Sequence, residues 1–305
     1  MVGRTDVTNV YPWHASTYQK VVDLLEQDRL PHALGLSSPP GWGIDQLAGL
    51  LASRLLERTG SSAEGMAHPD LRWIVPDGAV IKIEQVRGLV DFANQTAQIA
   101  PRKVAVILQA ETANANAANA LLKTLEEPPG NTHIILATEA WGRMLPTIRS
   151  RCQRFAIETG QDTVTEWLAQ NGFGDRGDRL ALDLFALEHG RSPLEMLAAM
   201  QPEDGSHTLS VKDWVSHLAT DSLSDLVKVA LEGDVAKWLS RWYRVLQPIA
   251  QTALEDNQEY ARQLMRFSDK ILDVRRQIVT SNAANERLLI EYLVLEWRKL
   301  GAHEA

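Results

Sequence analysis

Short runs of hydrophobic residues alternate with helical spacings through the first half of the chain. Most of these runs are continuously apolar, which is typical of strands that are covered on both faces of a parallel sheet. The predicted strands are Ala33–Ser37, Leu71–Val75, Val104–Leu108, His133–Thr138 and the weaker Cys152–Ile157. Amphipathic helices are predicted between them, at Ile44–Arg58, from Ile83 to Ala93 and at Asn114–Glu127, where Pro128 ends the last one. This alternation predicts βαβ units in an α/β module with a parallel sheet.

The strand pattern disappears after Ile157, and only helical patterns follow. We therefore predict an α/β module at 1–158, a small helical module at 159–206 and a larger all-helical domain at 207–305. The last domain contains long amphipathic stretches at Val235–Ala253, Arg262–Val279 and Glu286–Leu300, which could pack as a bundle. A kink is expected at Pro248 in the first of them.

Composition narrows the classes of function. The chain of 305 residues is 45% hydrophobic, which is too apolar for a disordered protein. With 31 basic and 39 acidic residues its net charge is −8, which argues against a protein that coats DNA by bulk positive charge. The single cysteine, Cys152, cannot form an internal disulfide or a cysteine-rich zinc site. No run of 18 apolar residues occurs, so we expect a soluble, cytoplasmic protein without membrane contact.

The segment from Ser38 to Asp45 lies where a predicted strand gives way to a helix, which is the place of a phosphate-binding loop. In the pattern GxxxxGK[ST], backbone N–H groups hold the phosphates, the lysine reaches the β- and γ-phosphates and the hydroxyl binds Mg²⁺. Here Gly41 and Gly43 are present, but Ser38 replaces the first glycine, Ile44 the lysine and Asp45 the hydroxyl residue. Tight ATP binding is therefore not expected. A simple turn before a helix is the alternative interpretation.

A second catalytic element is also missing. Phosphate-loop ATPases place an acidic pair at the end of a neighbouring strand, where it holds Mg²⁺ and orients the attacking water. The corresponding predicted strand ends in Leu108 and Gln109. Glu111 follows one or two residues too late, and we expect it to be a solvated loop carboxylate.

Several motifs between about 13 and 200 resemble one family. They are His32-Ala33-Leu34, the altered loop, His68-Pro69-Asp70, the run Asn119–Pro129 with the sequence NALLKTLEEPP, and Ser150-Arg151-Cys152. Together they resemble the delta-prime subunits of bacterial DNA polymerase III clamp loaders, within the AAA+ superfamily. The altered loop favours delta-prime over the related motor subunit, which keeps its lysine and threonine.

The resemblance implies an AAA+ module, a helical lid and a helical collar through which subunits form a ring. It further implies a subunit that does not hydrolyse ATP and that helps to open a sliding clamp and load it on primer-template DNA. The implied partners are the motor subunits (tau or gamma) and the delta subunit.

Two departures from the family are visible. Many members carry a four-cysteine zinc module before the His-Pro-Asp motif, but the stretch from Arg58 to Ala67 has no cysteine, so neither zinc nor another cofactor is expected. AAA+ ATPases often place an arginine of the lid on the γ-phosphate. Here Pro193 stands near that place, and the sequence does not decide whether Arg191 substitutes.

The resemblance assigns a trans-acting arginine finger to Arg151, between Ser150 and Cys152. An arginine at the rim of the sheet could reach the γ-phosphate of ATP held by a neighbouring subunit. Without the family, a solvated or ion-paired surface residue is the alternative. Cys152 is expected to be a small apolar residue rather than a nucleophile, and His32, His68 and His133 suggest no metal site.

The acidic pair Glu126-Glu127 opposes the dipole at the end of its predicted helix. A basic partner across a subunit face would explain the pair, and a solvated pair is the alternative.

Two rival functions remain open at this stage. The first is an active AAA+ ATPase subunit with an unusual loop. The second is a stand-alone DNA-binding module, for which Lys82, Arg87, Arg102 and Lys103 could form a basic patch.

Overall fold

The computed structural model describes residues 10–58, 63–64, 66–158, 160–173, 185–200, 211–281 and 284–301. The chain divides into two compact units, at 1–172 and 173–305. The division expected from the sequence, with boundaries after residues 158 and 206, stays a prediction. Parts of the expected small helical module, at 174–184 and 201–206, lie outside the described residues.

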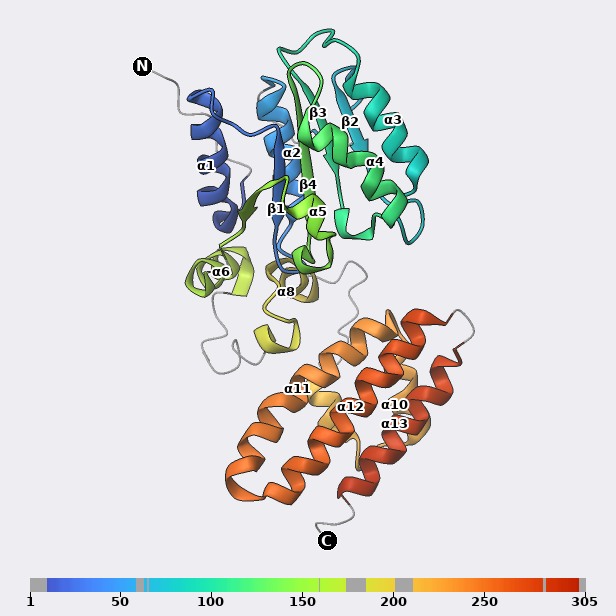
Figure 1. Cartoon of the computed structure of the whole chain (residues 1–305). Coiled ribbons are helices and arrows are strands. Elements are labelled where there is room, and N and C mark those ends of the chain that lie inside the picture. The colour runs from blue at the N-terminus through green and yellow to red at the C-terminus, as the bar shows by residue number, and fades with distance from the viewer. Residues whose placement is uncertain are drawn as a thin grey trace. The chain divides into compact units, whose positions relative to one another are not determined.

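A five-stranded parallel sheet forms the centre of the first unit (Figure 1). Its order is β2-β3-β4-β1-β5, and its strands are β1 (Ala33–Ser37), β2 (Leu71–Ile74), β3 (Lys103–Ile107), β4 (Thr132–Thr138) and β5 (Gln153–Ala156). All residues of β1, β3 and β4 are buried, because helices cover both faces of the sheet. The predicted α/β architecture with a parallel sheet is confirmed.

Helices connect the strands and pack against the sheet. They are α1 (Ala15–Glu26), α2 (Ile44–Leu55), α3 (Ile83–Ala93), α4 (Ala115–Glu126), α5 (Pro146–Arg149) and α6 (Gln161–Leu168). Short turns of helix are η1 (Pro12–His14), η2 (Ala110–Thr112), η3 (Trp141–Arg143) and η4 (Ala169–Phe173). α3 and α4 pack together on one face, while α2 contacts β1, β3 and β4 and packs against α1 on the other (Figure 1).

The second unit is helical in all its described elements. These are α8 (Pro193–Met200), α9 (Val211–His217), α10 (Leu223–Ala230), α11 (Val235–Asp256), α12 (Gln258–Thr280) and α13 (Glu286–Gly301). Aromatic side chains fill its core, where Trp242 lies between Trp214 and Phe267, at ring-centroid distances of 4.8 and 5.3 Å. Such buried indoles contribute large apolar areas, which explains why tryptophans recur on these amphipathic helices.

Two helix limits differ from the expected ones. α11 ends at Asp256 rather than at Ala253, and it continues through Pro248 as one helix, although a proline lacks the N–H for one helical hydrogen bond. The kink at Pro248 stays a prediction. α12 begins at Gln258 rather than near Arg262, because the Asn257 side chain accepts a hydrogen bond from the Tyr260 N–H and so caps the helix. Among the described residues, no helix is both long and apolar enough to cross a membrane.

Candidate functional site

The altered phosphate loop lies at the carboxyl edge of the sheet, between β1 and α2. The neighbouring strands β1 and β4 send their connections to opposite sides of the sheet, to β2 and to β5, and such a switch point is where open α/β sheets bind ligands. Gly41 and Gly43 have φ angles of +73° and +69°, a left-handed conformation that glycine adopts without steric cost. The two glycines thus keep a tight strand–loop–helix turn, with Gly43 as the N-cap of α2.

The polar groups of this loop are engaged by the chain itself. The Gly41 N–H donates to Oε1 of Glu139 at 3.0 Å, so a carboxylate takes a donor of the kind that holds phosphate in a working loop. The Ser38 hydroxyl donates to the Pro39 carbonyl at 2.9 Å. Ile44 is buried, and the Asp45 carboxylate lies in the first turn of α2. Two carboxylates and an apolar side chain therefore stand around a loop that would need a lysine.

An aromatic cluster holds the same loop from the N-terminal side. The indole N–H of Trp13 and Nε2 of His14 both donate to the Trp42 carbonyl, at 3.0 and 2.7 Å. Trp13 also packs edge to face on Trp42 and on Trp167, with ring centroids 5.8 and 5.0 Å away. Burial lowers the pKa of His14 to about 4, against the opposing effect of its hydrogen bond, so the ring is neutral at pH 7. Side chains of the chain itself therefore hold the loop in place.

The end of β3 carries no acidic pair. Leu108 is half-buried, and Gln109 is exposed in a left-handed turn with a φ of +49°. Glu111 is not the solvated carboxylate that we expected, because it is half-buried and its Oε2 accepts a hydrogen bond from the Thr138 hydroxyl at 2.6 Å. The reason is the position of Thr138 at the end of β4, the strand next to β3.

Arg151 lies at the opposite edge of the sheet from the loop. It precedes β5, whose Gln153 pairs with Leu34 near the start of β1 and whose Ala156 pairs with Ser37 at its end. Because β1 runs for five residues at about 3.3 Å each, roughly 15 Å of strand separates the two edges. Arg151 is therefore remote from the phosphate loop of its own chain.

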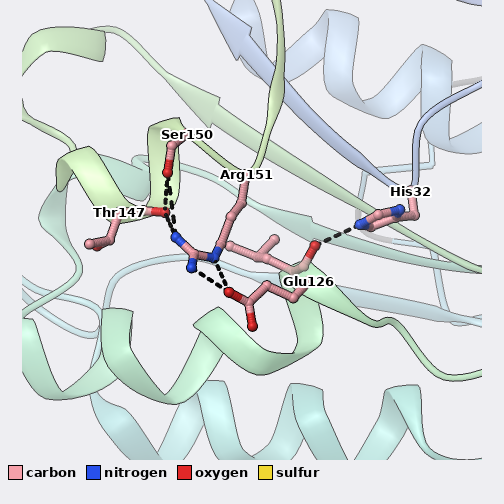
Figure 2. Close-up of polar contacts among 6 residues, drawn as sticks. His32, Glu126, Thr147, Ser150 and Arg151 are labelled. Carbon is pink, nitrogen blue, oxygen red and sulfur yellow. Dashed lines mark hydrogen bonds and ion pairs between the residues drawn. The ribbon is translucent and has the colours of Figure 1, made fainter.

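The guanidinium of Arg151 is held by the end of α4 (Figure 2). Its Nε donates to Oε1 of Glu126 at 2.6 Å, and its Nη2 contacts the same oxygen. Nη1 donates to the Thr147 carbonyl at 2.9 Å and lies 3.4 Å from the Ser150 hydroxyl. The Arg151 side chain is 31% exposed, so it is accessible from outside the chain.

This pair corrects one expectation. Of the two interpretations left open for Glu126-Glu127, a basic partner across a subunit face or a solvated pair, neither holds for Glu126, which has its basic partner in its own chain because the turn before β5 runs beside the end of α4. Glu127 is exposed and is the C-cap residue of α4. The end of α4 is further fixed by His32, whose Nε2 donates to the Leu125 carbonyl at 2.6 Å (Figure 2).

Cys152 is half-buried and packs against the core that α3, α4 and the sheet share. Burial raises the pKa of its thiol to about 12, so the thiolate that a nucleophile needs is not formed at neutral pH. This favours the expected apolar role. Within the described parts of the chain, no three His, Cys, Asp or Glu side chains gather as metal ligands. Residues 59–62 and 65, within the cysteine-free stretch from Arg58 to Ala67, lie outside the described residues.

The basic residues proposed as a DNA patch do not form a free positive surface. Lys103 is buried and donates to the carbonyls of Phe92 and Gln95. Lys82 pairs with Asp77 at 2.5 Å, and Arg102 lies 3.9 Å from Glu57. Arg87 is exposed on α3. Arg191, the candidate lid arginine, is exposed with a φ of +56° two residues before α8 begins at Pro193.

Residues 13–161 match the family model described as DNA polymerase III, delta subunit. The DNA polymerase III subunit delta' of Pseudomonas aeruginosa is 30% identical over 96% of this chain and 99% of its own length. The chain belongs to the delta-prime family of DNA polymerase III subunits. The delta-prime subunit of Escherichia coli is 32% identical over 52% of each chain.

One solved structure agrees with this family at the level of the fold. A gamma subunit-related protein of DNA polymerase III from Thermotoga maritima superposes with a TM-score of 0.55 at 20% identity. The match covers 93% of this chain and 99% of that one. Arg151 and Glu126 both lie within the residues that the family model matches.

Proposed function

We propose that this delta-prime family chain is a non-catalytic subunit of the DNA polymerase III clamp loader. Its role is to help assemble the ring that opens a sliding clamp and loads it on primer-template DNA. Its proposed partners are the motor subunits (tau or gamma) and the delta subunit, in the cytoplasm. Within this complex, Arg151 supplies an arginine finger in trans to ATP on a neighbouring subunit.

The observation that carries this proposal is the place of Arg151. A guanidinium at the amino edge of the sheet cannot serve a phosphate loop at the carboxyl edge of the same sheet. The side chain is partly exposed, and its planar fork suits phosphate oxygens. The phosphate that Arg151 contacts must therefore belong to a nucleotide on a neighbouring subunit.

The altered loop supports the lack of ATPase activity in the chain itself. Ile44 cannot supply the positive charge of the missing lysine, and Asp45 adds a negative charge where a triphosphate would lie. Glu139 already accepts a hydrogen bond from the loop, and Trp13 and His14 hold it from the other side. We therefore expect no tight ATP binding by this chain, and we prefer this function to an active ATPase. No zinc or other cofactor is expected either, because the chain has a single cysteine. The paired or buried state of Lys82, Arg102 and Lys103 disfavours a stand-alone DNA-binding module.

The test is Arg151→Ala in the reconstituted clamp loader. We expect the complex to form and its clamp- and DNA-stimulated ATP turnover to fall, because the guanidinium stabilises charge in the transition state. Where the best-studied fingers act alone, the effect is about 10³-fold or more. Here the fall is smaller, because other interfaces of the ring keep their own arginines. Turnover falls more than ATP affinity.

The matched control is Arg143→Ala. Arg143 is an exposed arginine in η3, on the connection that leaves the carboxyl end of β4. Its removal changes the charge of the chain by the same amount and is expected to leave turnover unchanged. If Arg151→Ala leaves turnover and clamp loading at the wild-type level in an intact complex, the proposed trans role is wrong.

A further inference from the structure

We propose that Glu126 is the positioning residue for Arg151, an inference that rests on the proposed trans role of that arginine. Glu126 lies at the end of α4, and Arg151 precedes β5, so the pair joins two segments that are 25 residues apart in the chain. In Figure 2 the Arg151 guanidinium faces the Glu126 carboxylate.

The contacts define the orientation of the guanidinium plane. Glu126 accepts from Nε and Nη2 on one side, and the Thr147 carbonyl accepts from Nη1 on the other. A guanidinium has five N–H donors in a rigid fork, and Nη1 also lies 3.4 Å from the Ser150 hydroxyl, so these contacts leave one N–H of Nη2 and the weakly held second N–H of Nη1 for an incoming phosphate. A long side chain that is already fixed loses less conformational freedom when it binds. Glu126 therefore prepares Arg151 before a neighbouring nucleotide arrives.

The carboxylate itself is on a fixed support. Asn114 caps the start of α4 by accepting from the Ala117 N–H at 2.9 Å, and His32 holds the Leu125 carbonyl near its end. Thr124 and Leu125 are buried in the last turn. The end of α4 that carries Glu126 is therefore held in place, as outer hydrogen bonds hold the ligands of a metal site.

A positioning role also accounts for an unfavourable charge. A carboxylate at a helix C-terminus opposes the helix dipole, and only a nearby cation offsets that effect. Glu126 has such a cation, whereas Glu127 is exposed at the C-cap and shows no ion pair with a described residue. The two adjacent carboxylates therefore differ in role, which makes Glu127 a natural control.

The experiment compares Glu126→Ala, Glu126→Gln, Glu127→Ala and Arg151→Ala in the reconstituted clamp loader, with complex formation checked by gel filtration. For Glu126→Ala we expect a several-fold fall in kcat for ATP, smaller than that of Arg151→Ala, with a smaller change in KM. Glu126→Gln keeps an acceptor oxygen but not the charge, so its fall is intermediate. Glu127→Ala leaves kcat unchanged.

The double variant Glu126→Ala with Arg151→Ala separates positioning from other effects. If Glu126 acts through Arg151, the double variant turns over ATP no more slowly than Arg151→Ala alone. An additive fall, an equal fall in Glu127→Ala or a rise in kcat for Glu126→Ala would each overturn the positioning role. Should Arg151→Ala slow turnover while Glu126→Ala does not, this inference fails and the proposed function stands. If kcat is unchanged in Arg151→Ala, the proposed trans role of Arg151 is wrong, and the positioning role of Glu126 is wrong with it.

Discussion

Gly35 sits in the middle of β1 beneath the ring of Trp141, where no side chain fits. A Cβ built at this position would lie 2.5 Å from the indole, which is well inside contact distance. Trp141 is in turn covered by the Arg154 guanidinium, 5.1 Å above its ring. The central strand therefore needs a glycine at this point for packing, not for backbone freedom.

Gly35→Ala is predicted to lower the free energy of unfolding by about 1–3 kcal/mol, because a rigid indole must shift to admit the methyl group. The measurement is urea unfolding followed by circular dichroism. Gly142→Ala is the matched control, since its new Cβ would meet nothing within 4 Å. Its effect should stay within about 0.5 kcal/mol. Equal stability of the wild type and Gly35→Ala would contradict the crowding seen at Trp141.

Single residues of the site were predicted only where a local motif marks them. Ser38, Ile44 and Asp45 stand out against the phosphate-loop pattern, and Arg151 lies in a specific tripeptide. Glu139 and His14 were not predicted, because they reach the loop across 98 and 28 residues of sequence. Contacts between residues so far apart in the sequence depend on the order of the strands in the sheet, and the spacing of residues along the sequence does not reveal that order. An acidic residue directly after a strand is the one signal that could have indicated Glu139.

At the scale of elements, continuous apolar runs located β1, β3 and β4, while β2 and β5 were located from weaker runs that each contain an arginine. β1 has the limits that its run predicts, whereas β4 begins one residue earlier, at the polar Thr132, whose hydroxyl donates to the Pro129 carbonyl. Helix ends were less predictable. α2 stops at Leu55 rather than Arg58, because Glu57 adopts a left-handed φ of +56° that ends the helix.

The loop between β1 and α2 leads to a prediction about nucleotide binding. Titration of the isolated chain with a fluorescent ATP analogue should give no low-micromolar Kd, because that affinity corresponds to about 8 kcal/mol of binding free energy. The loop lacks the lysine and hydroxyl that would provide much of it.

The positive control for this titration is a clamp-loader motor subunit in the same buffer. A low-micromolar Kd for the isolated chain, or measurable hydrolysis by it, would favour the active ATPase that the sequence left open.

At the scale of the whole molecule, the two units differ in the apolar surface that they expose. Among the described residues, large hydrophobic side chains on the surface lie mainly on the helical unit. They are Ile249, Leu254, Met265, Val279, Leu288, Tyr292 and Leu295, against Val75, Val80 and Ile99 on the first unit. Leu288, Tyr292 and Leu295 are spaced by four and three residues, so they line one side of α13. Such surfaces are typical of protein contacts.

A chain that ends at residue 206 is therefore predicted to stay folded in its α/β part but to lose assembly with the other clamp-loader subunits. Size-exclusion chromatography of the mixed subunits measures assembly, and circular dichroism measures the fold. A second variant, the full-length chain with Leu288→Asp, keeps the helical unit and changes only its exposed surface. A truncated chain that still enters the complex would show that the first unit suffices for assembly.

The two outer strands of the sheet have a consequence for the chain before it meets its partners. β2 and β5 are each four residues long, and each carries an exposed arginine, Arg72 and Arg154. Short, charged edges offer a poor template for another strand, so they protect against edge-to-edge aggregation. If the chain joins a ring as proposed, such edges would keep free copies of it from polymerising through their own sheets.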